Sequence, residues 1–288
     1  MDLSKITDIR SFYKKDNTDS TMNIKKEIDL VRQTLLKHNL STTNFDNNIS
    51  SFRIENDSLS NASGSYDYKR NQVVNASSGY DLVHEIFHMA SNDRSKNNEG
   101  GSIIKIHNTS VGFSLNEGIT DYFTYLSSDN KYEIKYPIEV FVLNLLRRVY
   151  GDKIFEFHFL NEGEKVFELF GDKKDEIIDY LTILDKFTLS SVKLSDSIAN
   201  IGSGRVSVNN INEMCDNLME SVEGIIRCLS NEDKNIEKEY FEEFKSLFNS
   251  SNESIRSLKE IIKLSNDYKD IDTLLSYMDE DIFYDFNL

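Results

Sequence analysis

The sequence predicts an α+β fold that is predominantly helical, with a small β-sheet in the first half of the chain and helices throughout the second. Two observations lead to this prediction. Only one proline occurs in 288 residues, so the commonest helix breaker is almost absent. Apolar residues recur every three or four positions through most of the chain, whereas strand-like patterns are confined to short stretches between residues 51 and 106.

The bulk composition is that of a globular protein with an acidic surface. Hydrophobic residues make up 39% of the chain and charged residues 28%, a balance that supports a sizeable core. Lys and Arg number 33 against 49 Asp and Glu, which gives a formal net charge of −16. Such a charge repels phosphate backbones and anionic lipids, so we expect neither nucleic acid nor a membrane as a partner.

The N-terminal sequence and the cysteines bear on the cellular compartment. Residues 1–20 lack the apolar central region of a signal peptide, and no uncharged apolar run reaches membrane-spanning length. Cys215 and Cys228 are the only cysteines. On one helix they would lie roughly 20 Å apart and could not form a disulfide. We therefore expect a cytoplasmic protein, and export by a route that needs no signal peptide stays open.

The first 75 residues predict a helix, a loop and a β-hairpin. Apolar residues at helical spacing predict a helix over 22–38, with Asn39 as its stop. A loop rich in Ser, Asn and Asp follows, with a short strand possible at 51–54. In GSYDYKRNQVVNASS, 64–78, alternating tyrosines, a Lys-Arg-Asn turn and a valine pair predict two short strands before the next helix.

The rest of the chain is predominantly helical, apart from a loop over 92–113 with one possible strand at 103–106. Pro137 suits the first position of a helix, and helical apolar spacing continues beyond it. A Gly/Ser break at 201–205 interrupts this pattern. We expect helices over 116–126, from 137, over 152–171 and over 174–189, followed by three amphipathic helices after the break.

The stretch YDLVHEIFHMAS carries two of the five histidines of the chain, four residues apart. On a helix, His84 and His88 project from one face, and their imidazoles can converge on one metal ion. Glu85 lies on the flank of that face, where it could take a proton from a water molecule bound to the metal. A helix lying on the surface with its histidines in solvent would show the same pattern. The pattern alone therefore does not decide between a metal site and two solvent-exposed histidines.

The second predicted helix carries another pair of this kind, in LNEGITDYF. Glu117 and Asp121 stand four residues apart, and apolar residues cover the opposite arc of the helix. Two successive helices would thus each turn metal-binding residue types away from their apolar face. Two plainer interpretations stay open, because Ser114 and Glu117 also match a capping box and Asp121 could be an ordinary solvated charge.

His-Glu-x-x-His followed by Asn-Glu-x-x-x-Asp resembles the signature of the gluzincin metallopeptidases, the thermolysin-like group. The resemblance covers about residues 64–126, and it implies a zincin-like fold in which the small sheet lies beside the zinc-binding helix. It implies that His84, His88 and Glu117 bind Zn²⁺ and that Glu85 is the general base. It also implies that Asp121 contacts the other ring nitrogen of His84.

The sequence departs from this family in two respects. Glu117 follows His88 by 29 positions (117 − 88), a longer spacing than in thermolysin. The Tyr or His that stabilises the transition state in the family has no clear counterpart, and His158, Tyr66 and Tyr68 are the candidates. The remaining histidines, at positions 38 and 107, have no motif around them.

We therefore expect an N-terminal helical segment over 1–50, a metallopeptidase domain over 51–189 and a helical bundle over 190–288. The expected function is zinc-dependent hydrolysis of a peptide or protein substrate, aligned along the hairpin by β-addition. The alternative is a non-catalytic, acidic, helical interaction protein whose zinc site is structural or vestigial. Neither interpretation specifies an oligomeric state.

Overall fold

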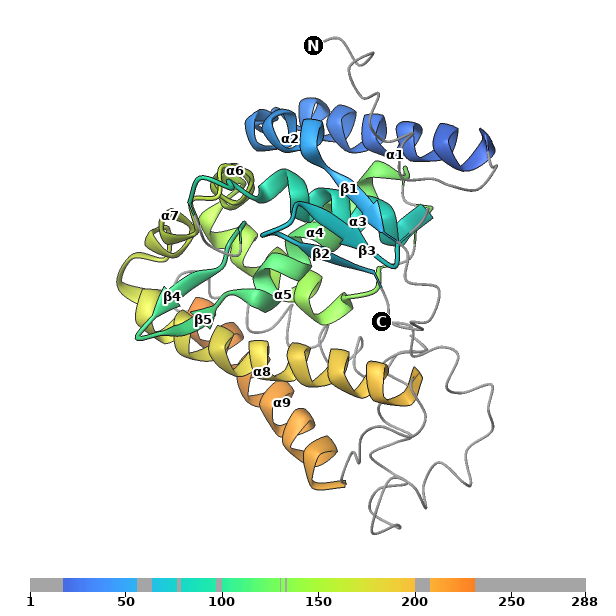
Figure 1. Cartoon of the computed structure of the whole chain (residues 1–288). Helices are drawn as coiled ribbons and strands as arrows, with labels where there is room; N and C mark the ends of the chain where they lie inside the picture. The colour runs from blue at the N-terminus through green and yellow to red at the C-terminus, as the bar shows by residue number, and fades with distance from the viewer. Residues whose placement is uncertain are drawn as a thin grey trace.

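The protein has an α+β fold that is mostly helical, as the sequence predicts (Figure 1). The computed structural model describes residues 18–55, 64–76, 79–96, 100–129, 131–132, 134–199 and 208–230. Within these residues, no helix combines the length and apolarity needed to cross a membrane. The helices are α1 Thr18–Lys37, α2 Thr43–Asn48, α3 Gly79–Ser91, α4 Phe113–Ser127, α5 Pro137–Tyr150, α6 Lys153–Phe159, α7 Gly163–Glu168, α8 Lys174–Ala199 and α9 Val208–Ser230, with 3-10 turns η3 Ile49–Ser51 and η4 Gly171–Lys173.

The predicted hairpin is present and belongs to a three-stranded sheet. The strands are β1 Arg53–Glu55, β2 Ser65–Asp67 and β3 Gln72–Val74, in the order β1-β3-β2. β2 pairs with β3 antiparallel and β1 pairs with β3 parallel. Because β3 lies in the middle, β2 is an edge strand of this sheet. Asp67 stabilises the turn between β2 and β3, since its carboxylate accepts hydrogen bonds from the backbone N–H groups of Lys69 and Arg70 at 3.0 and 3.1 Å.

A second, two-stranded sheet was only half predicted. β4, Ile104–Ile106, matches the expected strand, but its antiparallel partner β5, Thr109–Val111, falls in a region predicted as loop. The turn between the strands consists of His107 and Asn108, which both have positive φ. Asn takes this conformation more readily than most residues, but the polar composition around it favours loop over strand.

The predicted helices are confirmed with one exception among the described residues, but α2 and η3 fall in a stretch wrongly predicted as loop. Asn39 ends α1 with φ 55°, and Pro137 opens α5. The run 152–171 was wrongly predicted as one helix, because Asn161, with φ 53°, separates α6 from α7. α9 carries both cysteines on one helix, as expected. The break at 201–205 and the last two expected helices lie outside the described residues.

One hydrophobic core joins the described elements, and α3 lies at its centre. Figure 1 shows α1 along one side of the molecule and α8 with α9 along the other, with α3, α4 and α5 between them. The apolar side of α3 is fully buried, which confirms the arc predicted opposite the histidines. The buried residues of that arc are Leu82, Val83, Ile86, Met89 and Ala90.

The division of the chain into three segments, with boundaries near residues 50 and 190, stays a prediction.

Candidate metal centre

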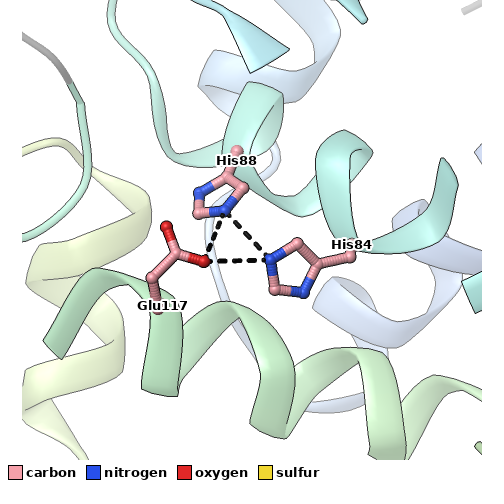
Figure 2. A group of neighbouring side chains, drawn as sticks. All are labelled: His84, His88 and Glu117. Atoms are coloured by element: carbon pink, nitrogen blue, oxygen red, sulfur yellow. Dashed lines mark hydrogen bonds and ion pairs between the residues drawn. The ribbon is translucent and has the colours of Figure 1, made fainter. Parts of the chain in front are cut away.

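Helices α3 and α4 pack against each other and bring two neighbouring histidines together with a glutamate that follows about 30 positions later. His84 and His88 project from α3 toward Glu117 of α4 (Figure 2). The two Nε2 atoms are 3.1 Å apart, and Glu117 Oε2 lies 3.2 Å from His84 Nε2 and 3.4 Å from His88 Nε2. The three residues thus form one group whose ligand atoms face a common point.

The size of this triangle fits a metal ion. Four ligands about 2.0–2.1 Å from a tetrahedral zinc ion stand roughly 3.4 Å from one another, by simple geometry from the bond lengths. The observed edges of 3.1–3.4 Å are close to one face of such a tetrahedron. Two histidines and a glutamate are also a ligand set that zinc accepts. The residues present therefore fit Zn²⁺ without rearrangement of the helices.

The three side chains are withdrawn from solvent, which contradicts the interpretation with histidines on the surface. Their side-chain exposures are 5% for His84, 12% for His88 and 7% for Glu117. Burial alone would lower the pKa of His88, but the Glu117 carboxylate raises it to about 8. Burial alone would raise the pKa of Glu117, yet His88 and His84 together hold it far below its usual range. In the absence of a metal ion, an ion pair therefore holds the group together.

Glu85 is also buried, beside the two histidines. Burial raises the pKa of its carboxyl, and the positive charges of His88 and His84 oppose that rise. The start of β2 lies against this side chain, because a Cβ added at Gly64 would stand 3.5 Å from Glu85 Cγ. The edge strand and the candidate base are therefore neighbours.

The outward ring nitrogens of the two histidines have different supports. His84 Nδ1 lies 3.2 Å from the Tyr80 hydroxyl, which donates to Asp121 Oδ1 at 2.5 Å. The expected direct contact between Asp121 and His84 is thus replaced by a contact through Tyr80. The other support comes from α4, where Asn116 Nδ2 and Thr120 Oγ1 lie 3.1 and 3.3 Å from His88 Nδ1.

The plainer interpretations of the second motif are wrong. Asp121 is fully buried, so it is no solvated charge. α4 begins at Phe113, ahead of the supposed capping box, and the side chain of Ser114 contacts Asp185 instead. Asp185, on α8, accepts hydrogen bonds from the backbone N–H groups of Gly112 at 2.8 Å and Ser114 at 2.7 Å. Glu117 is therefore free to face the histidines.

The three candidates for a transition-state group do not contact the three-residue group through hydrogen bonds in the described part of the chain. His158 is buried, its Nδ1 lies 2.9 Å from Ser102 Oγ, and burial lowers its pKa to about 3. The Tyr66 hydroxyl donates to Asn71 Oδ1 at 2.9 Å. Tyr68 lies in the hairpin turn. Within the described part of the chain, none of them is hydrogen-bonded to the three-residue group.

Two tyrosines that sequence reasoning missed contact the group instead. The rings of Tyr80 and Tyr136 both stack on His84, with centroids 5.5 and 5.6 Å away. Tyr80 had a readable signal, because it precedes His84 by four residues and so shares its helix face. Tyr136 had none, since it lies outside both motifs.

Comparison with known proteins adds no assignment, because no protein-family model, curated protein or solved structure matches this chain. The resemblance to the gluzincins therefore stays a prediction, and the geometry of the group is the evidence that bears on function.

Proposed function

We propose that the protein is a zinc-dependent metallopeptidase. The observation that carries the proposal is the convergence of two imidazole nitrogens and one carboxylate oxygen at the mutual distances of a tetrahedral zinc site. In the described part of the chain this group has three members. Three protein ligands are typical of catalytic zinc sites, whereas structural sites use four. The count therefore favours the enzyme over the non-catalytic alternative.

His84, His88 and Glu117 would hold the ion, and Glu85 would accept a proton from water. A bound zinc ion supplies acidified water and polarises a carbonyl group. Glu85 suits its part because burial raises the pKa of its carboxyl toward the range in which it can both accept and release a proton. In the described part of the sheet β2 is an edge strand, which would give an extended peptide a strand to pair with, next to Glu85.

Metal analysis of protein purified without chelator tests the first half of the proposal. We expect about one zinc ion per chain, and its loss in Glu117→Ala. Glu220→Ala, which changes an exposed glutamate of α9, is the matched control and should keep the metal. Wild-type protein without metal, even after zinc is supplied, would contradict the zinc site.

A peptide library read by mass spectrometry tests the second half. Zinc-loaded wild-type protein should cleave a subset of peptides, a chelator should stop cleavage, and added zinc should restore it. If fully loaded protein cleaves nothing in a broad library, the peptidase proposal is wrong and the group is a structural metal site.

A further inference from the structure

Tyr80 lies on the same face of α3 as His84, and its hydroxyl stands between a histidine and a carboxylate. The oxygen is 3.2 Å from His84 Nδ1 and 2.5 Å from Asp121 Oδ1. The other oxygen of Asp121 accepts the backbone N–H of Tyr136 at 2.6 Å. The three side chains therefore form one hydrogen-bonded chain that ends in a carboxylate held by α4 and by the start of α5.

The direction of the hydrogen bonds in this chain follows from the number of protons. A phenol has one proton to donate, and a carboxylate at the shorter distance is the stronger acceptor. Burial raises the pKa of Tyr80 well above its usual value, and the Asp121 charge adds to this, so the phenol stays protonated. The Tyr80 oxygen then accepts a hydrogen from His84 Nδ1. The lone pair of His84 is consequently on Nε2, which faces His88 and Glu117.

The Tyr80 ring has little freedom to leave this position. The Lys135 ammonium group lies over the ring, 4.6 Å from its centroid, and is paired with Asp81 at 2.9 Å. The ring of Tyr132 packs edge-on against the Tyr80 ring, with centroids 5.9 Å apart, and the His84 ring stacks on the Tyr80 ring. The hydroxyl is thus held in place by packing as well as by its hydrogen bonds.

We infer that Tyr80 is a positioning residue that connects Asp121 to His84 and fixes the tautomer in which His84 offers Nε2 to a metal ion. The inference rests on the proposed zinc site. It assigns the support of the first histidine to a chain of three residues, in which the hydrogen-bonded connection from Asp121 to His84 runs through the phenol. Supports of this kind typically contribute about 10–100-fold to metal affinity.

A double-mutant cycle on zinc affinity, measured by competition with a chelator, tests the connection. Tyr80→Phe and Asp121→Asn should each weaken zinc binding by about 10–100-fold. The zinc affinity of the double variant should be no lower than that of the single variant with the lower affinity, because either change breaks the same hydrogen-bonded chain. Wild-type affinity in Tyr80→Phe, or losses that multiply in the double variant, would overturn the inference. Tyr132→Phe, which removes a hydroxyl from a neighbouring ring, is the control and should bind as wild type does.

The tautomer of His84 gives a second readout that needs no metal and no activity. In the metal-free wild-type protein, ring ¹⁵N NMR should show His84 protonated at Nδ1, and Tyr80→Phe should lose this preference while its circular dichroism spectrum is unchanged. Should the proposed zinc site fail, this measurement still decides the inference. A His84 tautomer that is the same in both proteins would overturn it.

Discussion

Helices α3 and α4 each place a pair of residues four positions apart on one face, yet they contribute differently to the site. α3 carries two of the proposed ligands, His84 and His88, and the proposed base, Glu85. α4 carries the third proposed ligand, Glu117, together with side chains that support both histidines, and these are almost entirely buried. Within the described residues, the Glu85 carboxylate makes no hydrogen bond, whereas both oxygens of Asp121 accept one.

The two helices are also anchored differently. The N-terminus of α4 donates three hydrogen bonds to Asp185 of α8, and Gly118 brings α4 against the backbone of α5 so closely that a Cβ there would stand 2.6 Å from the Glu139 carbonyl oxygen. Counting only bonds between described residues, the N-terminus of α3 donates one, from Gly79 to Glu27 of α1 at 2.5 Å. Among the described residues, α4 is therefore the more firmly anchored of the two helices.

The largest expected effect comes from a substitution on α3 and concerns the rate of hydrolysis alone. Glu85→Gln keeps the shape of the side chain but cannot accept a proton from water at neutral pH. We expect zinc to stay bound and the rate of peptide cleavage to fall by about 10²–10⁴-fold. Single-turnover cleavage of a library-derived peptide, with metal content measured on the same sample, checks this. A variant that cleaves as fast as wild type would remove Glu85 from the mechanism.

The second expected effect couples the helices through a proton. In the metal-free protein Glu117 raises the pKa of His88 to about 8, so at neutral pH a metal ion must displace a proton. Zinc affinity should therefore fall by about tenfold for each pH unit below 8 and level off above it. Calorimetry in two buffers at pH 7 should show about one proton released per zinc ion.

Glu117→Gln, studied without metal, is the control for this linkage. It removes the charge that raises the pKa of His88, so that pKa should be lower than in the wild-type protein. An NMR titration of the histidine rings in the two metal-free proteins measures it. A His88 pKa that is the same in both would show that the released proton comes from another group.

The third effect concerns how firmly each helix is anchored. Asp185→Ala leaves two buried backbone N–H groups and the Ser114 hydroxyl without their acceptor, and we expect a loss of about 2–3 kcal/mol in the free energy of unfolding. Glu27→Ala should cost less, about 0.5–1 kcal/mol, because it removes one bond and also a buried oxygen that has no partner among the described residues. Urea unfolding of both variants measures the difference. Equal losses would contradict the idea that α4 is the better-anchored helix.

The sequence predicted most of this arrangement where the interaction is local. The spacing of four residues places His84 beside His88, and Glu117 beside Asp121, whatever the rest of the chain does. The hairpin was readable for the same reason, because alternation and a turn lie within a dozen residues.

What the sequence did not predict depends on distances between elements. α4 was expected to begin at residue 116, yet it begins at Phe113, because its N-terminus is capped by Asp185 of α8, about 70 positions later, rather than by a neighbouring residue. Likewise, Tyr80 lies between Asp121 and His84 because of the spacing between the two helices. No local pattern encodes that spacing, which packing contacts such as that of Gly118 against α5 determine.

The smallest expected effect tests whether the two histidines are supported unequally. A neutral His88 that binds a metal through Nε2 carries its proton on Nδ1 and needs an acceptor there. The Thr120 hydroxyl oxygen, 3.3 Å from Nδ1, can accept this hydrogen, whereas the Asn116 atom near Nδ1 is the amide nitrogen, a donor. Asn116→Ala therefore leaves the acceptor in place. We expect zinc affinity to fall by less than about tenfold, below the loss expected when Asp121 is changed.

The pair of variants Asn116→Ala and Asn116→Ala/Thr120→Val sharpens this last comparison. The double variant removes both partners of His88 Nδ1, and its zinc affinity should fall by about 10–100-fold, as for the single change of Asp121 to Asn. Chelator competition on the three proteins under one set of conditions gives the ranking. If Asn116→Ala alone already matches Asp121→Asn, Thr120 contributes nothing. Each histidine would then depend on a single support, and the difference between the two sides of the site would vanish.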